Sequence, residues 1–185
     1  MSLPLLHDAV DLLRLRVAPL EHYRYPPLHL ALALLLLGTL AAAGAINAGA
    51  GGEPAALIGL FTLYVTLETL GFSLFMRWWL NRAGAQLQHS LFGLILAASG
   101  LQVLDPLTYW LPDDVAQGLS LVLGVGNILI LVTALSRCSG TSRSRVLLGT
   151  LLFAPLALAL LLGLLGLGSD LGLTNIPELV APGGQ

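Results

Sequence analysis

One acidic side chain, Glu68, stands near the middle of a long apolar segment, residues 55–80. The segment is long enough to cross a bilayer, because a membrane helix needs about 20 mostly apolar residues. An ionisable group at the centre of such a helix costs roughly 2.5–3.5 kcal/mol on insertion scales, and groups retained there usually have a partner or a function. Glu68 is therefore the first candidate for a functional residue.

Hydroxyl groups accompany Glu68 along the same segment. Tyr64 lies four residues earlier, so the two side chains share one helix face. One interpretation is a group that couples to a proton or cation, or that contacts a partner subunit. The other is a protonated Glu68 hydrogen-bonded to a threonine, to Asn127 or to a backbone carbonyl group. The sequence leaves both open. The nearby threonines are Thr62, Thr66 and Thr69.

Two other polar features lie outside this segment. Asn127 is an amide in the middle of the apolar stretch 115–135. It can hydrogen-bond between helices, worth about 0.6–2 kcal/mol, and this structural role is favoured over a substrate contact. Asp105, Asp113 and Asp114 form an acidic group that could attract a cation or a basic partner, although ordinary turns and helix caps explain these residues equally simply and are favoured.

The motifs of common catalytic sites are missing from the sequence. There is no GxSxG, no HExxH, no glycine loop for phosphate and no rhomboid-like serine and histidine pair. The histidines are scattered without metal-ligand spacing, and Cys138 is the single cysteine. We therefore expect no enzyme, no metal site and no cofactor. The histidines are His7, His22, His29 and His89.

Composition assigns the chain to the membrane. Of its 185 residues, 56% are hydrophobic and 10% are charged, whereas soluble domains carry about 25% charged residues. All eight basic residues are arginine, and the chain is rich in Leu, Ala and Gly, which favours a GC-rich bacterial source and the cytoplasmic (inner) membrane. A net charge of −2 gives no reason to expect nucleic acid as a partner.

The apolar pattern predicts an all-α integral membrane protein with five transmembrane helices. The third segment contains Asp105-Pro106, where we expect it to end or kink, because proline disfavours helix at the preceding residue. The predicted domain organisation is an N-terminal amphipathic helix with a Pro/Tyr-rich connector (1–27), a five-helix domain (28–168) and a polar tail (169–185). The predicted spans are 28–48, 55–80, 87–104 with a continuation to 110, 115–135 and 146–167.

Arginine placement predicts the orientation of these spans. The segment before span one, the end of span two with the loop after it, and the segment between spans four and five carry three, two and three arginines, and the other connections carry none. Short arginine-rich segments stay on the inner side. We therefore expect the N-terminus inside and the C-terminus outside.

Residues 2–17 are predicted to form the amphipathic helix. At 100° per residue its apolar residues fall on one side and most of its polar residues, Asp8 among them, on the other, so it can lie in the membrane interface or pack on the bundle. Aromatic and basic residues are expected to anchor the ends of two spans at the membrane surface. These candidate anchors are Arg77, Trp78, Trp79, Tyr109 and Trp110.

Residues 88–168 resemble the bacterial branch of the Yip-domain membrane proteins. The likeness rests on the polar-to-apolar stretch QHSLF (88–92), on DPL (105–107), on the basic loop before span five and on RVLL (145–148). The resemblance implies a small helical membrane protein without known catalysis, whose eukaryotic relatives act as scaffolds in membrane traffic.

Two functions remain open from the sequence. The first is a non-catalytic accessory or scaffold subunit that packs against other membrane proteins in the lipid bilayer. The alternative is a small transporter or channel component that uses Glu68 for proton or cation coupling. That class usually shows internal repeats and broken helices around a site at the membrane midplane, and neither is evident in the sequence. A water-filled cavity joining Glu68 to Asn127 or Gln102 would favour it, and would equally revive an intramembrane enzyme, for which the sequence shows no cluster of nucleophile and base.

Overall fold

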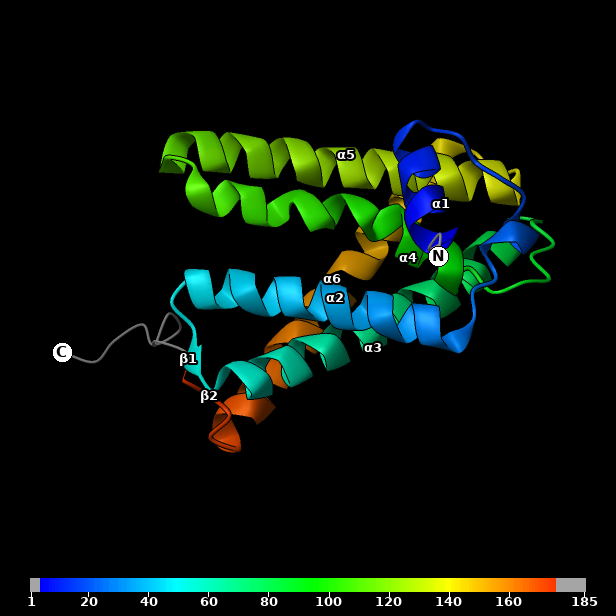
Figure 1. Ribbon diagram of the computed structural model, residues 1–185. Helices are drawn as coiled ribbons and strands as arrows, with labels where there is room; N and C mark the ends of the chain where they lie inside the picture. Colours follow the sequence, from blue (N-terminus) through cyan, green and yellow to red (C-terminus); the bar gives the residue numbers. More distant parts are fainter. Residues whose placement is uncertain (1–3, 176–185) are drawn as a thin grey trace.

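The computed structural model describes residues 4–175 and is built almost wholly from helices (Figure 1). Within this range five helical segments are long and apolar enough to cross a membrane, which confirms the predicted number. They are α2 (Pro27–Asn47), α3 (Pro54–Asn81), α4 (Phe92–Ala98) continued by the 3₁₀ helix η2 (Ser99–Trp110), α5 (Asp113–Ser139) and α6 (Arg143–Asp170).

Proline and glycine set the limits of these helices. Pro27 and Pro54 occupy the first turns of α2 and α3, where a missing N–H leaves no hydrogen bond unmade. Gly140 follows α5 with φ +68°, a left-handed conformation that ends the helix and lets the chain turn back into α6. Pro155 lies inside α6, which nevertheless continues to Asp170.

The helices pack as two neighbouring pairs joined by α6. Antiparallel α2 and α3 lie side by side, and η2 lies beside α5, while α6 runs obliquely from the end of α5 across to α3 (Figure 1). Gly38 of α2 sits directly on the backbone of Thr62 in α3, leaving no room for a Cβ atom. This close approach is the usual role of small residues between membrane helices.

The third span changes its winding in mid-course. It begins at Phe92, later than the predicted residue 87, and becomes a 3₁₀ helix at Ser99, seven residues before Pro106. The Ser99 hydroxyl donates to the Ile95 carbonyl oxygen (3.1 Å), and Gly100 is pressed against Ala9 of the N-terminal helix. A 3₁₀ run of 12 residues is unusually long, since most stop after three or four.

The segments that carry arginine meet at one end of the bundle, called here the arginine end. Arg137, at the end of α5, donates to the Leu15 carbonyl oxygen at 2.7 Å, and Arg24 contacts His89. Trp79 of α3 donates its indole N–H to the Arg145 carbonyl oxygen at 3.0 Å. At the opposite end, two-residue strands β1 (Gly51–Gly52) and β2 (Thr174–Asn175) pair antiparallel.

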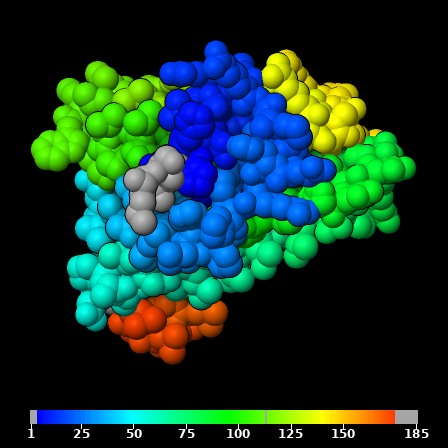
Figure 2. Space-filling view, turned by 45° about the vertical axis from the view of Figure 1, so that its right-hand side comes forward, coloured from blue at the N-terminus to red at the C-terminus, as the bar shows by residue number. Residues whose placement is uncertain are grey.

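The N-terminal helix α1 (Pro4–Leu13) is shorter than predicted and packs on α4, η2 and α5. It turns Asp8, Ala9 and Leu12 inward, whereas the pattern had placed Asp8 on the polar side. Asp8 is buried because it accepts hydrogen bonds from Tyr25 (2.6 Å) and His22 (2.9 Å) of the connector, which contains the 3₁₀ turn η1 (Leu20–Tyr23). Figure 2 shows this N-terminal segment covering one face of the molecule. A location in the membrane interface stays a prediction.

The limits of the outer elements also differ slightly from the predicted ones. α6 continues to Asp170, so the helical domain reaches two residues beyond residue 168, and Thr174 is buried where β2 pairs with β1. The remainder of the predicted polar tail, residues 176–185, lies outside the described residues, as do residues 1–3.

Candidate functional site

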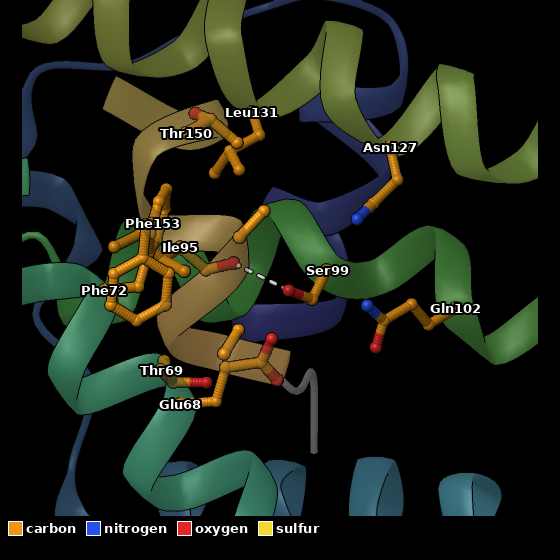
Figure 3. Close-up of a pocket in the computed structure, with 12 residues that line it drawn as sticks. Glu68, Thr69, Phe72, Ile95, Ser99, Gln102, Asn127, Leu131, Thr150 and Phe153 are labelled. Carbon is orange, nitrogen blue, oxygen red and sulfur yellow. Dashed lines mark hydrogen bonds between the residues drawn. The ribbon is translucent and has the colours of Figure 1, made fainter. Parts of the chain in front are cut away.

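A cavity of about 260 Å³ lies between α3, α4–η2, α5 and α6, and Glu68 lines it (Figure 3). Liquid water occupies about 30 Å³ per molecule, so the space can hold several waters or one small organic ion. Its wall is polar on one side and apolar on the other. The lining residues are Glu68, Thr69, Phe72, Ile95, Ser99, Gln102, Asn127, Leu131, Thr150, Phe153, Ala154 and Ala157.

Helix α3 supplies the acidic group. Glu68 is partly buried, and the next residue, Thr69, is buried with it, because this turn of α3 faces the inside of the bundle. Among the described residues that line the cavity, Glu68 is the single charged side chain. Its surroundings contain no arginine or histidine to pair with it. A carboxylate here must be neutralised by a proton or by a cation that enters the cavity.

The broken third span supplies an amide and a hydroxyl opposite Glu68. Ser99 and Gln102 are three residues apart, and in a 3₁₀ helix side chains at this spacing stand one above the other. In an α-helix the second side chain would be rotated by about 60° from the first. The change of winding at Ser99 therefore directs both groups into the same cavity, as Figure 3 shows.

Helix α5 adds a second amide, Asn127. Its side-chain oxygen is buried and has no hydrogen-bond partner within residues 4–175. A buried acceptor left unsatisfied costs about 1–3 kcal/mol, so it calls for a water, a proton donor or a cation in the cavity. The sequence had favoured a structural hydrogen bond between helices for Asn127. No such bond is present in the described part of the chain.

Two aromatic rings form the apolar wall. Phe72 and Phe153 meet edge to face, with ring centroids 5.1 Å apart and planes at 61°. The electron-rich face of a phenyl ring attracts organic cations as well as apolar groups. The cavity thus offers one carboxylate, several neutral oxygens and two aromatic rings. These groups can bind a monovalent cation, because one carboxylate balances one positive charge.

Tyr64, grouped with Glu68 by sequence, does lie beside it, and its hydroxyl group donates a hydrogen bond to the Glu68 carboxyl group. Tyr64 does not line the cavity but packs with apolar residues between α2 and α3, among them Leu37 and Phe61. The residues that the sequence did not single out for the site are Ser99 and Thr150. Ser99 could have been found from the three-residue spacing of polar groups along the third span. No pattern in the sequence points to Thr150.

The five candidate anchors divide between surface and interior. Arg77 and Trp78 are exposed, with Arg82 placed 4.3 Å above the Trp78 ring. Trp110 is 88% exposed, whereas Trp79 stacks on Phe75 and is held between α3 and α6. The hydroxyl of Tyr109 points at Gly44 of α2, so this partly buried residue packs against that helix.

Comparison of the chain with protein-family models, with curated proteins and with solved structures found no match. The fold and the site thus define a class, a helical bundle with five apolar helices of membrane-spanning length around a polar cavity. The resemblance to the Yip-domain family stays a prediction.

Proposed function

We propose that the protein is a small cation- or proton-coupled transporter, or a component of a channel, in which Glu68 is the coupling group. The observation that carries this proposal is the cavity that brings Glu68 together with Gln102 and Asn127. A second support is the third span, whose change from α to 3₁₀ winding at Ser99 is the kind of broken helix that transporters place beside their sites.

Charge restricts the ligand class in this proposal. A single carboxylate among neutral oxygen donors suits a proton or a monovalent cation, whereas divalent cations such as Ca²⁺ are usually held by several carboxylates. Residues 4–175 contain no cluster of three or more acidic, histidine or cysteine ligands. The cavity volume of about 260 Å³ admits a dehydrated alkali ion with water or a small ammonium ion.

The test is ion flux in liposomes that contain the purified protein and the pH dye pyranine. Gradients of sodium, potassium and methylammonium are applied in turn. At least one gradient should drive a pH change with the native chain, and Glu68→Gln should slow it at least about tenfold by removing the titrating group. Glu53→Gln is the control, because Glu53 is exposed at the start of α3. Equal flux with Glu68→Gln, or no flux with any ion, would contradict the proposal.

A second candidate function is the accessory subunit, which the exposure of α6 favours. Only 11% of its most apolar 18-residue window is buried, against 39% for the third span. In Figure 2 the last turns of α6 (orange) protrude below α3, against which one side of them packs. Gly163 and Gly166 have open space beside them, where a second helix could approach closely.

The accessory function is tested by gentle extraction from native membranes and mass spectrometry of what stays bound. A companion protein in fixed stoichiometry that is lost from a Gly163→Leu, Gly166→Leu variant would support it. Gly59→Leu serves as the control, since this glycine of α3 also has open space beside it. A bare protomer in native lipid would count against it. In both proposals the protein lies in the bacterial inner membrane with its N-terminus inside.

A further inference from the structure

A second cavity, of about 350 Å³, lies between η2 and α5 on the side of Glu68 away from the arginine end. Gln102 and Asn127 line this cavity as well as the first one. The two spaces therefore meet at this pair of amides. The residues that line the second cavity are Leu101, Gln102, Asp105, Thr108, Tyr109, Ser120, Leu123, Gly124 and Asn127.

The third span carries a polar group at every third position through both cavities. Ser99 and Gln102 line the first, and Gln102, Asp105 and Thr108 line the second. All four lie in the 3₁₀ helix, where a spacing of three residues keeps side chains on one face. In an α-helix the first and last would lie on opposite faces. At about 2.0 Å per residue this polar row extends roughly 18 Å, more than half the thickness of a bilayer core.

The charge along this row is negative only. Asp105 is partly buried, and no ion pair joins it to a basic side chain of the described residues. The segment from Ser99 to Trp110 contains no basic residue. A path with carboxylates at Asp105 and Glu68 and neutral oxygens between them attracts cations and repels anions.

The other side of the Glu68 cavity is closed. Between it and the arginine end, α3, α4, α5 and α6 are joined by side chains with no exposed surface, in a cluster that also includes Phe72 and Phe153. A charged solute would have to displace this packed apolar layer to pass. The fully covered residues are Met76, Leu80, Leu91, Leu94, Leu135 and Val146.

We propose that Asp105 forms an outer cation site at the mouth of one access path, which leads past the Gln102–Asn127 pair to Glu68. This inference rests on the proposed function and specifies it further: the cation reaches Glu68 from the end opposite the arginines, and Asp105 selects its charge. The structure then represents the state that is open to that end and closed toward the arginine end.

Cysteine labelling from one side of the membrane tests the path. In a Cys138→Ala background, Ser99→Cys is exposed in sealed proteoliposomes to the cationic thiol reagent MTSET or the anionic MTSES. The Ser99 position should react with MTSET from the side opposite the arginine end, and more slowly with MTSES. Val103→Cys is the position control, because Val103 is 41% exposed on the same helix but lines neither cavity. It should stay unlabelled in the lipid.

The role of Asp105 is tested by its charge. Asp105→Asn should reduce the MTSET rate at Ser99→Cys about tenfold and leave the MTSES rate unchanged or higher. Asp114→Asn, which removes an exposed carboxylate at the same end, should change neither. An unlabelled Ser99→Cys, or equal effects of the two variants, would overturn the inference.

Failure of the path and failure of the proposed function give different results. If Glu68→Gln abolishes flux while Ser99→Cys is inaccessible, the coupling role stands and the path is wrong. If Ser99→Cys is labelled through a charge-selective path while Glu68→Gln leaves flux intact, the path stands and the coupling role is wrong.

Discussion

The two ends of the bundle use the same five helices in opposite ways. At the arginine end, the connector, α4 and the ends of α3 and α5 interlock around side chains with no exposed surface. At the other end, η2 and α5 leave a space of about 350 Å³ lined by hydroxyl, amide and carboxyl groups. The difference teaches that apolar packing closes one end, while a change of helical winding keeps the other open.

This contrast makes the Glu68 cavity accessible from one end of the bundle and closed at the other. A polar cavity sealed at both ends would need internal partners for every buried polar group. Here the Asn127 oxygen has no partner in the described part of the chain, and the cavity it faces adjoins a second one toward the open end. Variants at one end should therefore behave differently from matched variants at the other.

The largest effect is expected from loss of volume in the closed end. Met76 is fully buried beside Gly149, so Met76→Ala should lower the free energy of unfolding by about 2–5 kcal/mol. Leu123→Ala, at the wall of the open cavity, should cost about 1 kcal/mol or less, because few atoms pack on its cavity side. Unfolding by denaturant in micelles measures both. Equal losses would show that the two ends are packed alike.

A smaller loss is expected from an added methyl group at the closed end. Gly93 lies against the backbone carbonyl of Tyr23, so Gly93→Ala forces the connector away and should cost about 1–3 kcal/mol. Gly118 in α5 has open space beside it, and Gly118→Ala should stabilise the helix by about 0.5–1 kcal/mol. Thermal unfolding of the two variants checks the sign of each change. A tolerated Gly93→Ala would contradict the close approach.

Asn127→Leu should separate stability from function. It removes a buried oxygen without a partner, so the free energy of unfolding in the absence of cation should stay constant or rise by about 1 kcal/mol. Ion flux should fall in this variant, because only one of the two amide oxygens, that of Gln102, remains to bind the cation. The check is unfolding and liposome flux on the same preparation. A strongly destabilised variant would return Asn127 to the structural role predicted from the sequence.

The sequence allowed the helices to be predicted better than the site. The five spans follow from length and apolar composition, which decide membrane insertion almost alone. The change of winding at Ser99 could not be predicted, because Asp105-Pro106 is the only helix-breaking pair in the sequence of this span. The 3₁₀ helix begins well before that pair, next to Gly100, where Ala9 of α1 packs against the span. With α winding, Ser99, Gln102 and Asp105 would turn away from one another by about 60° at each step, so Gln102 was predicted as a partner of Glu68 and Ser99 was not.

The burial of Asp8 was also beyond the sequence. A helical pattern places this residue among polar neighbours, but the connector brings Tyr25 and His22 to it across 17 and 14 residues. Such long-range hydrogen bonds outweigh the local pattern, because a paired carboxylate can be buried at little net cost. The N-terminal helix is therefore amphipathic in sequence, yet turns an acidic group inward.

The smallest effect concerns Tyr25 at the closed end. Burial and then the hydrogen bond to Asp8 raise the pKa of the Tyr25 phenol above its ordinary value. Its contribution to stability is therefore complete below about pH 10, the pKa in the unfolded chain, and declines as pH rises further. The stability difference between native chain and Tyr25→Phe should be constant from pH 7 to about 10 and shrink above it. A difference that persists at higher pH would place the phenol in water.

Cation-dependent thermal stability tests the central claim most directly. The native chain and Glu53→Gln, heated in nanodiscs with sodium, potassium or methylammonium against N-methylglucamine, should unfold at higher temperature with at least one small cation. The gain should reach about 2.7 kcal/mol at 100 times the dissociation constant, and Glu68→Gln should abolish it. The same gain in Glu68→Gln, or no gain with any of the three cations, would contradict a cation site at Glu68.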